Sequence, residues 1–517
     1  MTVRRVRVRR DTYVDSVGLL NLSRDMRGVT DVVWADALMG TAANVLVLAE
    51  AGFDVREVEP LRANDLVLAV AAETEDAAAR AFMVAAEPTA GGGPVAETGT
   101  LEAEQPQSLQ EAVDALGDAN VAVISVPGAY AVLESHKALT AGLHVLLFSD
   151  NVTLADEVAL KRRAAQLGLL IMGPGAGTAV LGGVGLGFAN VVRHGPVRVV
   201  SAAGTGAQEV MTLLHRFGAG VSDVIGVGGR DLSREVGGLM ARQAIAANRP
   251  DDGRDPVIVV VSKPPDPDVA TTLLDALTGR RAVCAFIGLD RPVRPPQGVR
   301  VVFTLEQAVL EALDLLAVAA PNPTSGLRAV AERAAADLHD GRRAVRGLFS
   351  GGTLCYEAMV ILARRLGAVH SNTPLREEWS LSAAPEGAHI CLDLGEEEYT
   401  RGRPHPMIDP LARADELGRA AADPTVAVML VDVVLGHGAH PDPAGELAKL
   451  LGRIRPRTDG PAVVAYVLGT DEDPQSAPDQ RARLEEVGCV VAPTNARAAL
   501  LAAAVAARRP ELAEEAP

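Results

Sequence analysis

The sequence predicts an α/β, multi-domain protein built mainly on parallel sheets, and two patterns carry this prediction. Short, continuous apolar runs such as Val121–Val126 and Val257–Val261 alternate with longer segments of helical periodicity. Buried strands that are joined by helices are typical of a parallel sheet covered on both faces. The length of 517 residues exceeds that of one ordinary domain, so three or four domains are expected.

The composition limits the classes of partner. Apolar residues make up 48% of the chain and aromatic residues only 3%, so the cores must rely on Ala, Val and Leu. The net charge of −17 argues against a nucleic-acid partner, which would require a basic face. No uninterrupted apolar run reaches about 18 residues, the length of a membrane span. We therefore expect a cytoplasmic protein without a membrane partner, whose small anionic substrate is captured by local geometry.

The cysteines predict neither a metal site nor a redox motif. The chain has four, and none of them forms a CxxC pair: Cys284, Cys355, Cys391 and Cys489. Cys355 falls in the first turn of an expected helix, where a thiolate is favoured, although a small buried residue is the simpler interpretation.

Breaks in the pattern divide the chain into six segments. A stretch rich in Pro, Gly, Thr and Glu lacks apolar periodicity, and a second, Pro-rich break follows a long helix. The expected segments are a small N-terminal α/β domain (1–86), a linker (87–107), three α/β domains (108–190, 191–320 and 346–510) and a second linker (321–345).

Two of these domains look like copies of each other. Gly204–Glu209 (GTGAQE) and Gly352–Glu357 (GTLCYE) both follow a strand that ends near a serine. Later, 301–316 and 490–503 share a strand–Thr–helix plan. The repeat is long, so it predicts duplicated domains rather than a solenoid.

Both copies begin a helix with a glycine-rich turn. The start of a helix leaves N–H groups free and carries about half a positive charge, and glycine lets an anion approach the backbone. A single turn of this kind is an ordinary packing feature, but two in equivalent positions favour a pair of helix starts that converge on one shared phosphate-like anion. The predicted phosphate-binding residues of these turns are Gly204, Thr205, Gly206, Gly351, Gly352 and Thr353.

Several phrases resemble a known superfamily. Ile171–Pro174 with Gly182–Gly185 is similar to the succinyl-CoA synthetase α subunit, and Gly352–Glu357 resembles the helix start at that enzyme's phosphohistidine. Within the superfamily the chain most resembles FdrA, through four longer phrases: Gly182–Asn190, Gly226–Asp231, Thr400–Asp409 and Val433–Pro443.

The resemblance carries expectations about fold and function. It implies a Rossmann-like, CoA-binding-like domain at 108–190 and flavodoxin-like succinyl-CoA synthetase domains at 191–320 and 346–510. FdrA proteins are linked to a multi-subunit oxamate carbamoyltransferase, which exchanges a carbamoyl group between carbamoyl phosphate and an amide-bearing acid. A hetero-oligomer with other subunits, or a homo-oligomer, is therefore expected.

Two departures from the superfamily pattern argue against CoA. The glycine loop GxTGxxG, through which the ligase binds CoA, is absent before Val121. No histidine follows the strand Val257–Val261 before His339, where the ligase's phosphorylated histidine would be expected. The cofactor is left open, and CoA binding by the family's usual route is not expected.

The candidate catalytic residues are therefore histidines of the second half. His440 follows the apolar strand 426–434 in a glycine-rich loop, and His405 lies in the proline-fixed segment 401–406. Histidine suits nucleophilic or acid–base work near neutral pH, although either residue can also be a plain loop histidine. His437, in the same loop as His440, is more simply a loop residue.

Four cationic residues are predicted to bind phosphate or carboxylate: Arg230, Lys263, Arg401 and Arg403. Arginine makes bidentate contacts with both anions. Alternatively, the arginines at 401 and 403 pair with Glu396–Glu398, and Lys263 caps a strand edge. Asp432 is unusual inside an apolar strand, where it would orient a donor or accept backbone hydrogen bonds.

The sequence thus predicts an FdrA-like subunit that transfers a carbamoyl group from carbamoyl phosphate to an acid such as oxamate, or the reverse. The first alternative is an NDP-forming acyl-CoA synthetase (an acid–thiol ligase), which would require an ATP-using partner. The second alternative is a non-catalytic scaffold subunit.

Overall fold

The computed structural model describes residues 2–14, 16–54, 60–85, 106–247, 255–289, 293–336, 338–400, 404–454 and 460–517. The chain forms two compact units, a small one within residues 1–104 and a large one that contains residues 105–400 and 405–517. The linker predicted at 87–107 lies almost entirely outside the described residues. So do Arg401 and Arg403.

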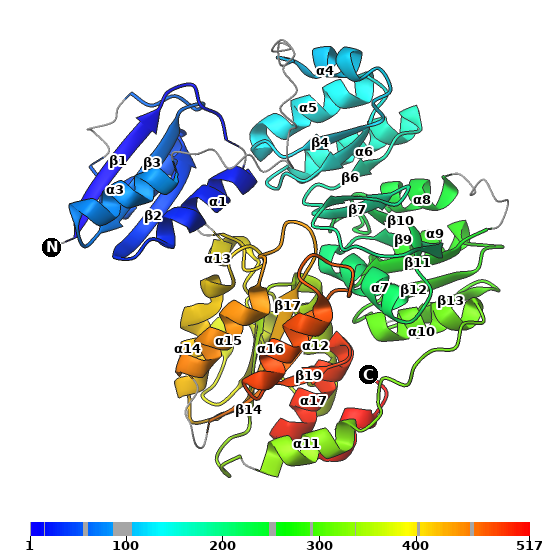
Figure 1. The fold of residues 1–517 in the computed structure, drawn as a ribbon. Coiled ribbons are helices and arrows are strands. Elements are labelled where there is room, and N and C mark those ends of the chain that lie inside the picture. Colours follow the sequence, from blue (N-terminus) through cyan, green and yellow to red (C-terminus); the bar gives the residue numbers. More distant parts are fainter. Residues whose placement is uncertain are drawn as a thin grey trace. The chain divides into compact units, whose positions relative to one another are not determined.

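The small unit is a three-stranded antiparallel sheet in the order β1-β3-β2, with helices on both faces (Figure 1). Alternate residues of β3 explain this arrangement: Leu68 and Val70 pack with α1 and α3, whereas Val67 and Ala69 face α2. The elements are β1 (Val3–Arg9), α1 (Ser16–Arg27), β2 (Val32–Met39), α2 (Ala42–Glu50), β3 (Leu66–Ala72) and α3 (Glu75–Val84).

The large unit begins with a small parallel sheet of three short strands, in the order β4-β5-β6. Its elements are α4 (Leu109–Leu116), β4 (Val121–Ile124), α5 (Gly128–Thr140), β5 (His144–Leu147), α6 (Leu154–Leu167) and β6 (Ile171–Met172). The domain predicted at 108–190 therefore extends beyond this sheet, whose last strand ends at Met172. The hairpin formed by β7 (Thr178–Leu181) and β8 (Val184–Gly187) instead pairs, through β7, antiparallel with β10 (Val221–Gly226) of the next sheet.

That next sheet has seven strands in the order β13-β12-β11-β9-β10-β7-β8, of which β9 to β13 are parallel. Its strands are β9 (His194–Ser201), β10 (Val221–Gly226), β11 (Val257–Ser262), β12 (Ala282–Phe286) and β13 (Val299–Val302). Its helices are α7 (Gly204–Arg216), α8 (Leu239–Ala246), α9 (Pro267–Ala276) and α10 (Leu305–Leu315).

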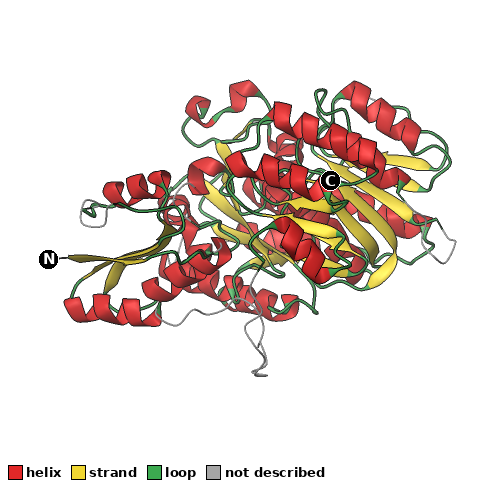
Figure 2. Cartoon of the chain, turned by 90° about the horizontal axis from the view of Figure 1, so that it is seen from above, coloured by secondary structure: helices red, strands yellow, loops and turns green. Residues whose placement is uncertain are grey.

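The last sheet has six parallel strands in the order β15-β16-β14-β17-β18-β19. Its strands are β14 (Ala344–Phe349), β15 (Val369–His370), β16 (His389–Asp393), β17 (Val426–Val434), β18 (Ala462–Leu468) and β19 (Val490–Ala492). Its helices are α12 (Gly352–Leu366), α13 (Glu397–Thr400), α14 (Ala414–Ala422), α15 (Pro443–Ile454), α16 (Ala477–Glu486) and α17 (Asn495–Ala507). Helices cover the strands of both large sheets (Figure 2).

Five strands have the same order in the two large sheets. The run β13-β12-β11-β9-β10 corresponds to β19-β18-β17-β14-β16, and in both sheets the central strand (β9 or β14) leads into a glycine-started helix. The final helices also begin alike, because Thr304 and Thr494 each accept a hydrogen bond from the amide three residues later. The strand order expected from the repeated sequence is therefore present.

The connection between the two halves is partly helical. We expected a linker at 321–345, but α11 (Leu327–Ala336) lies within it. Leu327 and Ala331, four residues apart and so on one helix face, are buried in the core that both halves share. Because this segment starts with a proline-rich stretch, its short amphipathic helix was not predicted from the sequence.

Candidate functional site

The starts of α7 and α12 lie directly against each other within the large unit. The amide of Thr353 donates a hydrogen bond to Thr205 Oγ1 at 3.2 Å. A Cβ atom on Gly206 would lie 2.9 Å from Thr353 Cγ2, and a Cβ atom on Gly351 would lie 2.9 Å from Thr205 Cγ2. Glycine at 206 and 351 is therefore what lets these two helix starts approach so closely.

The first amides of both helices remain available to a ligand. Neither Ala203 nor Gly351, the two N-cap residues, supplies a side-chain cap. Within the described part of the chain, no protein group accepts a hydrogen bond from the amides of Gly204, Thr205 or Gly352. Two uncapped helix starts, each with about half a positive charge, therefore face the same region.

A cavity of about 570 Å³ opens at these helix starts. The two turns contribute Gly204, Thr205, Gly352 and Thr353, and Lys263 and His405 reach it from elsewhere. The remaining lining residues come mostly from loops at the carboxyl ends of strands: Phe148, Asp150, Gly175, Ala176, Gly177, Thr178, Phe188, Ser201, Ala202, Ala203, Ala207, Gln208, Gly226, Gly228, Gly229, Ser350, Asp393, Gly395, Glu396, Thr400, Met407 and Ile408. Ligands of parallel sheets bind at this edge.

Lys263 supplies the cationic side chain of the cavity. It follows the last residue of β11, and its Nζ lies 5.5 Å from the centre of the Tyr356 ring. Among the described residues that line the cavity it is the one lysine or arginine. A bound anion would therefore be held by backbone amides and a single ammonium group.

Asp393, the last residue of β16, brings a carboxyl group to the same place. Its side chain is buried, and Oδ1 accepts a hydrogen bond from the Gly395 amide at 3.0 Å. Burial raises the pKa of Asp393 to about 7, the nearby charge of Glu396 raises it further, and Lys263 opposes the shift. A carboxyl group with such a pKa exchanges a proton near neutral pH.

His405 is held as a neutral imidazole. Burial lowers its pKa to about 4, and Arg413 lowers it further while Asp432 opposes the shift. Nδ1 accepts a hydrogen bond from the Met407 amide at 3.2 Å, which leaves the ring proton on Nε2. Nε2 faces Gly395, where a Cβ atom would lie only 2.6 Å away. His405 therefore offers a neutral N–H donor beside Asp393.

Asp432 fixes the turn that leads into α12. One oxygen accepts from the amide and the hydroxyl of Ser350, and the other accepts from the Gly351 amide at 2.8 Å. The buried Arg413 donates to the same carboxylate at 3.1 Å. The expectation that this strand aspartate accepts backbone hydrogen bonds is confirmed.

Two predicted site residues, His440 and Arg230, take other positions, and His437 is a loop residue, as its sequence context suggested. His440 does not line the cavity: its Nδ1 accepts from the Asp442 amide, and its own amide donates to Met407 O. The loop of His437 packs on the first half, since the His437 amide donates to Ala189 O. Arg230 donates to Glu157 at 2.7 Å and to Val152 O at 2.8 Å, so its charge serves a buried network and not the cavity.

Other predicted residues support the cavity or lie outside the described chain. Gly206 and Gly351 stand behind its surface, at the contact between the two helices. Arg401 and Arg403 lie outside the described residues. The thiol of Cys355 is buried, and burial raises its pKa well above the usual range, which favours the simpler interpretation of a core residue.

Sequence reasoning missed the acidic side of the cavity. Asp393, Asp150 and Glu396 all line it, and none was predicted to be a site residue. A signal for Asp393 was present, because it stands at the carboxyl end of a short apolar run, where ligand-binding residues gather in parallel sheets. For Asp150 and Glu396 the position depends on how the loops fold back, which the sequence pattern does not reveal.

Comparison with known proteins shows the family to which the chain belongs. Residues 348–505 match the family described as CoA-ligase, and residues 1–106 match the one described as AllF, heavy metal-associated domain. The uncharacterised protein YahF of Escherichia coli strain K12 is 37% identical over 506 residues, which are 96% of this chain and 97% of YahF. The chain belongs to the same family as YahF. The finer resemblance to FdrA stays a prediction.

Two further similarities are more distant. The α subunit 2 of an ADP-forming succinate–CoA ligase from Archaeoglobus fulgidus is 30% identical over 126 residues, 24% of this YahF-family chain and 44% of that protein. A solved dinucleotide-forming acetyl-coenzyme A synthetase from Korarchaeum cryptofilum is 16% identical, with 76% of this chain and 84% of that chain covered and a TM-score of 0.26. Among the described residues no helix is long and apolar enough to cross a membrane.

The thiolate and imidazole ligands that the description of the N-terminal domain suggests are missing from its sequence. Residues 1–106 of this YahF-family chain contain neither cysteine nor histidine, and the soft ligands that they do contain are the thioethers of four methionines. No cluster of potential metal ligands is present among the described residues either. The small unit therefore offers no thiolate or imidazole ligand to a heavy metal.

Proposed function

We propose that the cavity at the starts of α7 and α12 binds the phosphate of an acyl phosphate, and that the chain transfers the acyl group between phosphate and an acceptor. The proposal rests on one observation. Two uncapped, glycine-started helices from the two halves converge on one cavity, and Lys263 reaches the same cavity. Paired helix starts are suited to a dianion that must be stabilised as a leaving group.

The residues of the cavity suggest how the transfer proceeds. The amides of Gly204, Thr205 and Gly352, with Lys263, would hold the phosphate oxygens. The bond between the acyl carbon and the bridging oxygen breaks, the phosphate leaves with that oxygen, and a new bond forms from the acyl carbon to the acceptor atom. The acceptor's proton passes to the Asp393 carboxylate, whose pKa of about 7 suits a base at neutral pH.

Two versions of this function differ in the chemical class of the acceptor. Similarity to the CoA-ligase family over residues 348–505 and to succinate–CoA ligase subunits supports a thiol acceptor, as in an acid–thiol ligase. Such a ligase needs a nucleotide step, which we assign to a partner protein. The absence of the GxTGxxG loop before Val121 instead favours a small amide acceptor and carbamoyl phosphate, the reaction of oxamate carbamoyltransferase.

The test is an assay of phosphate release by the purified protein. Acetyl phosphate and carbamoyl phosphate would each be offered with CoA or with oxamate, in the presence and absence of the products of neighbouring genes. Release that depends on CoA identifies the thiol version, and release that depends on oxamate identifies the carbamoyl version. No acceptor-dependent release in any combination would contradict the proposal and leave a scaffold role.

Two variants connect the assay with the cavity. Lys263→Met removes its cationic side chain and should lower turnover about 100-fold, as the loss of one charge-stabilising group does in other active sites. His440→Ala is the matched control, because His440 lies outside the cavity lining, and it should retain wild-type turnover. Equal losses in the two variants would contradict the assignment of the site.

A further inference from the structure

Behind the cavity, two glutamates join the halves in a reciprocal way. Glu209 lies on α7 and Glu357 lies on α12, each five residues after the first residue of its helix. Glu209 Oε1 accepts from the amide of Asn495, the first residue of α17 in the other half. Glu357 Oε1 accepts at 2.6 Å from the amide of Leu305, the first residue of α10 in the opposite half.

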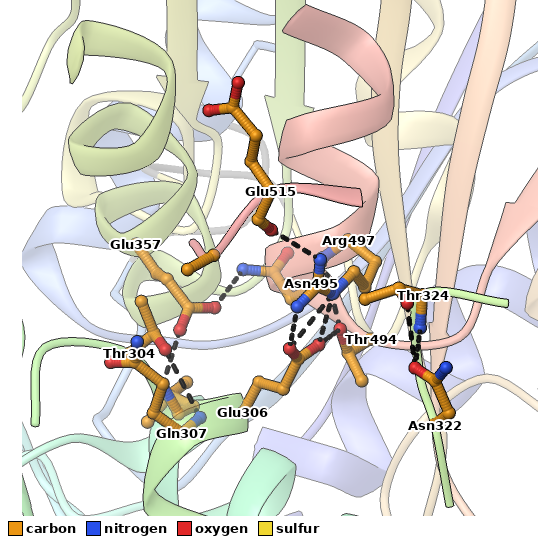
Figure 3. Close-up of polar contacts among 12 residues, drawn as sticks. Thr304, Glu306, Gln307, Asn322, Thr324, Glu357, Thr494, Asn495, Arg497 and Glu515 are labelled. Carbon is orange, nitrogen blue, oxygen red and sulfur yellow. Dashed lines mark hydrogen bonds and ion pairs between the residues drawn. The ribbon is translucent and has the colours of Figure 1, made fainter. Parts of the chain in front are cut away.

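Further hydrogen bonds complete each carboxyl group. Glu209 Oε2 accepts from the Tyr466 hydroxyl at 2.5 Å. Glu357 Oε2 accepts from Asn495 Nδ2 at 2.7 Å (Figure 3). The amide group of Asn495 also donates to Leu354 O at 3.0 Å, in the first turn of α12. Both glutamates are fully buried. Both hydrogen-bond partners of Glu209 thus lie in the other half, whereas Glu357 has one partner, Leu305, in the other half and one, Asn495, in its own.

A third glutamate, Glu306, links α10 with α17. Glu306 of α10 accepts from the Thr494 hydroxyl at 2.6 Å and pairs with Arg497 of α17 at 2.5 Å (Figure 3). The seam between the halves therefore has three layers: the contact of α7 with α12 at the cavity, the two crossed glutamates, and the contact of α10 with α17.

We propose that Glu209 and Glu357 are positioning residues, which set the spacing of the two helix starts so that one phosphate can contact both. The inference rests on the proposed function. Two helix starts of like partial charge repel when the cavity is empty, so a restraint from behind is needed to keep them facing. The crossed glutamates supply it, since each binds one anion-facing helix to the start of a helix that belongs to the other half.

The test replaces Glu357 with a side chain of similar volume that cannot accept a hydrogen bond. Glu357→Met leaves the Leu305 amide without an acceptor, whereas Glu357→Gln keeps an acceptor oxygen for that amide. Phosphate affinity would be measured by calorimetry on the full-length chain, and stability by thermal unfolding. Glu357→Met should bind phosphate about tenfold more weakly, the size of effect expected when a group that orients a direct ligand is lost, and Glu357→Gln should restore the affinity.

Glu306→Gln is the matched control. It weakens the same seam at the Arg497 pair and should lower the melting temperature, but it should leave the phosphate dissociation constant within about twofold of wild type, which is about 0.4 kcal/mol. The corresponding variants of Glu209, in the other half, should behave in the same way: Glu209→Met should weaken phosphate binding and Glu209→Gln should restore it. If Glu357→Met does not fold, Glu357→Asp, which is shorter by one methylene, makes the same comparison.

The outcomes separate this inference from the proposed function. A wild-type chain that binds phosphate, together with a Glu357→Met variant of unchanged affinity, overturns the positioning role and leaves the function standing. Equal weakening by Glu306→Gln also overturns it, because the effect would then be general loosening of the seam. A wild-type chain with no phosphate-specific binding overturns both.

Discussion

Ser350 is bound twice by Asp432: its amide at 2.8 Å and its hydroxyl at 2.7 Å both donate to the same carboxylate oxygen. The second carboxylate oxygen accepts from Gly351. A single side chain on β17 thus fixes the two residues that precede α12. The direction in which the Gly352 and Thr353 amides point is therefore determined by a neighbouring strand and not by the helix itself.

The substitution Asp432→Asn should destabilise the chain strongly. The amide nitrogen of asparagine would face backbone donors, and the buried Arg413 would lose its counter-charge. Removing one partner of a buried ion pair costs about 3–5 kcal/mol. The free energy of unfolding in urea is the measurement. Ser350→Ala, which loses one hydrogen bond, should cost only about 1 kcal/mol. Similar losses for the two variants would show that Arg413 does not depend on Asp432.

The two helix starts should respond differently to the same small change. A Cβ atom on Gly352 would lie 2.3 Å from Asp393 Oδ2, whereas a Cβ atom on Gly204 meets nothing within 4 Å. Gly352→Ala should therefore lower the melting temperature, and Gly204→Ala should leave it unchanged or raise it, because alanine favours a helix by up to about 1 kcal/mol.

A double-mutant cycle identifies the cause of the Gly352→Ala loss. In an Asp393→Ala background the added methyl group has room, so Gly352→Ala should cost clearly less there than in the wild type. Additive costs would mean that the strain lies in the backbone and not in the contact with Asp393.

The charge of Asp393 should control anion binding near neutral pH. Its folded pKa of about 7 means that the carboxyl group loses its proton as the pH rises through 7, and the new negative charge then repels an anion at α12. Sulfate is the suitable probe, because it does not change charge in this range. Wild-type affinity for sulfate should fall as the pH rises through about 7, and Asp393→Asn should bind sulfate almost independently of pH. A variant that keeps the wild-type pH dependence would assign the titration to another group.

Glu357 should make the chain less stable at higher pH. Burial raises its pKa from 4.5 to about 8, hydrogen bonds from Asn495 and Leu305 oppose the shift, and the charges of Glu209 and Glu306 add to it. Because the folded carboxyl group holds its proton more tightly than the unfolded one, its contribution to stability is full below about pH 4.5 and is lost as the pH rises to about 8.

The measurement for Glu357 is unfolding free energy against pH. Glu357→Gln cannot ionise, so the difference in stability between the variant and the wild type should grow in the variant's favour between pH 4.5 and 8. A difference that stays constant over this window would show that Glu357 is not protonated in the folded chain.

Local sequence signals predicted the elements of this fold well. The repeated helix starts and the final helices that follow a threonine stand near their expected positions, because each depends on neighbours in the chain. The convergence of Gly204 and Gly352 was also expected, since both follow the central strand of a duplicated sheet. The predicted domain boundary at 190 differed from the sheet, because the β7–β8 hairpin pairs with a strand more than thirty residues later.

The candidate site was only partly accessible to sequence reasoning. Lys263 and His405 were recognised as chemically useful residues in loops, and both line the cavity. His440 looked equally suitable, but its loop packs against Phe188 and Ala189, a contact that no local pattern announces. The crossed glutamates were hidden for the same reason: Glu209 and Glu357 stand at one offset in the repeat, yet their partners are more than fifty residues away.

Because both halves belong to one chain, the assembly of the cavity does not depend on the protein concentration. The two helix starts belong to one polypeptide, so their encounter is an intramolecular event with an effective local concentration that dilution does not change. A cavity shared by two separate polypeptides loses its second wall when the protein is diluted below their dissociation constant. In this chain the covalent connection through α11 prevents that loss, and both walls are made in equal number by every round of translation.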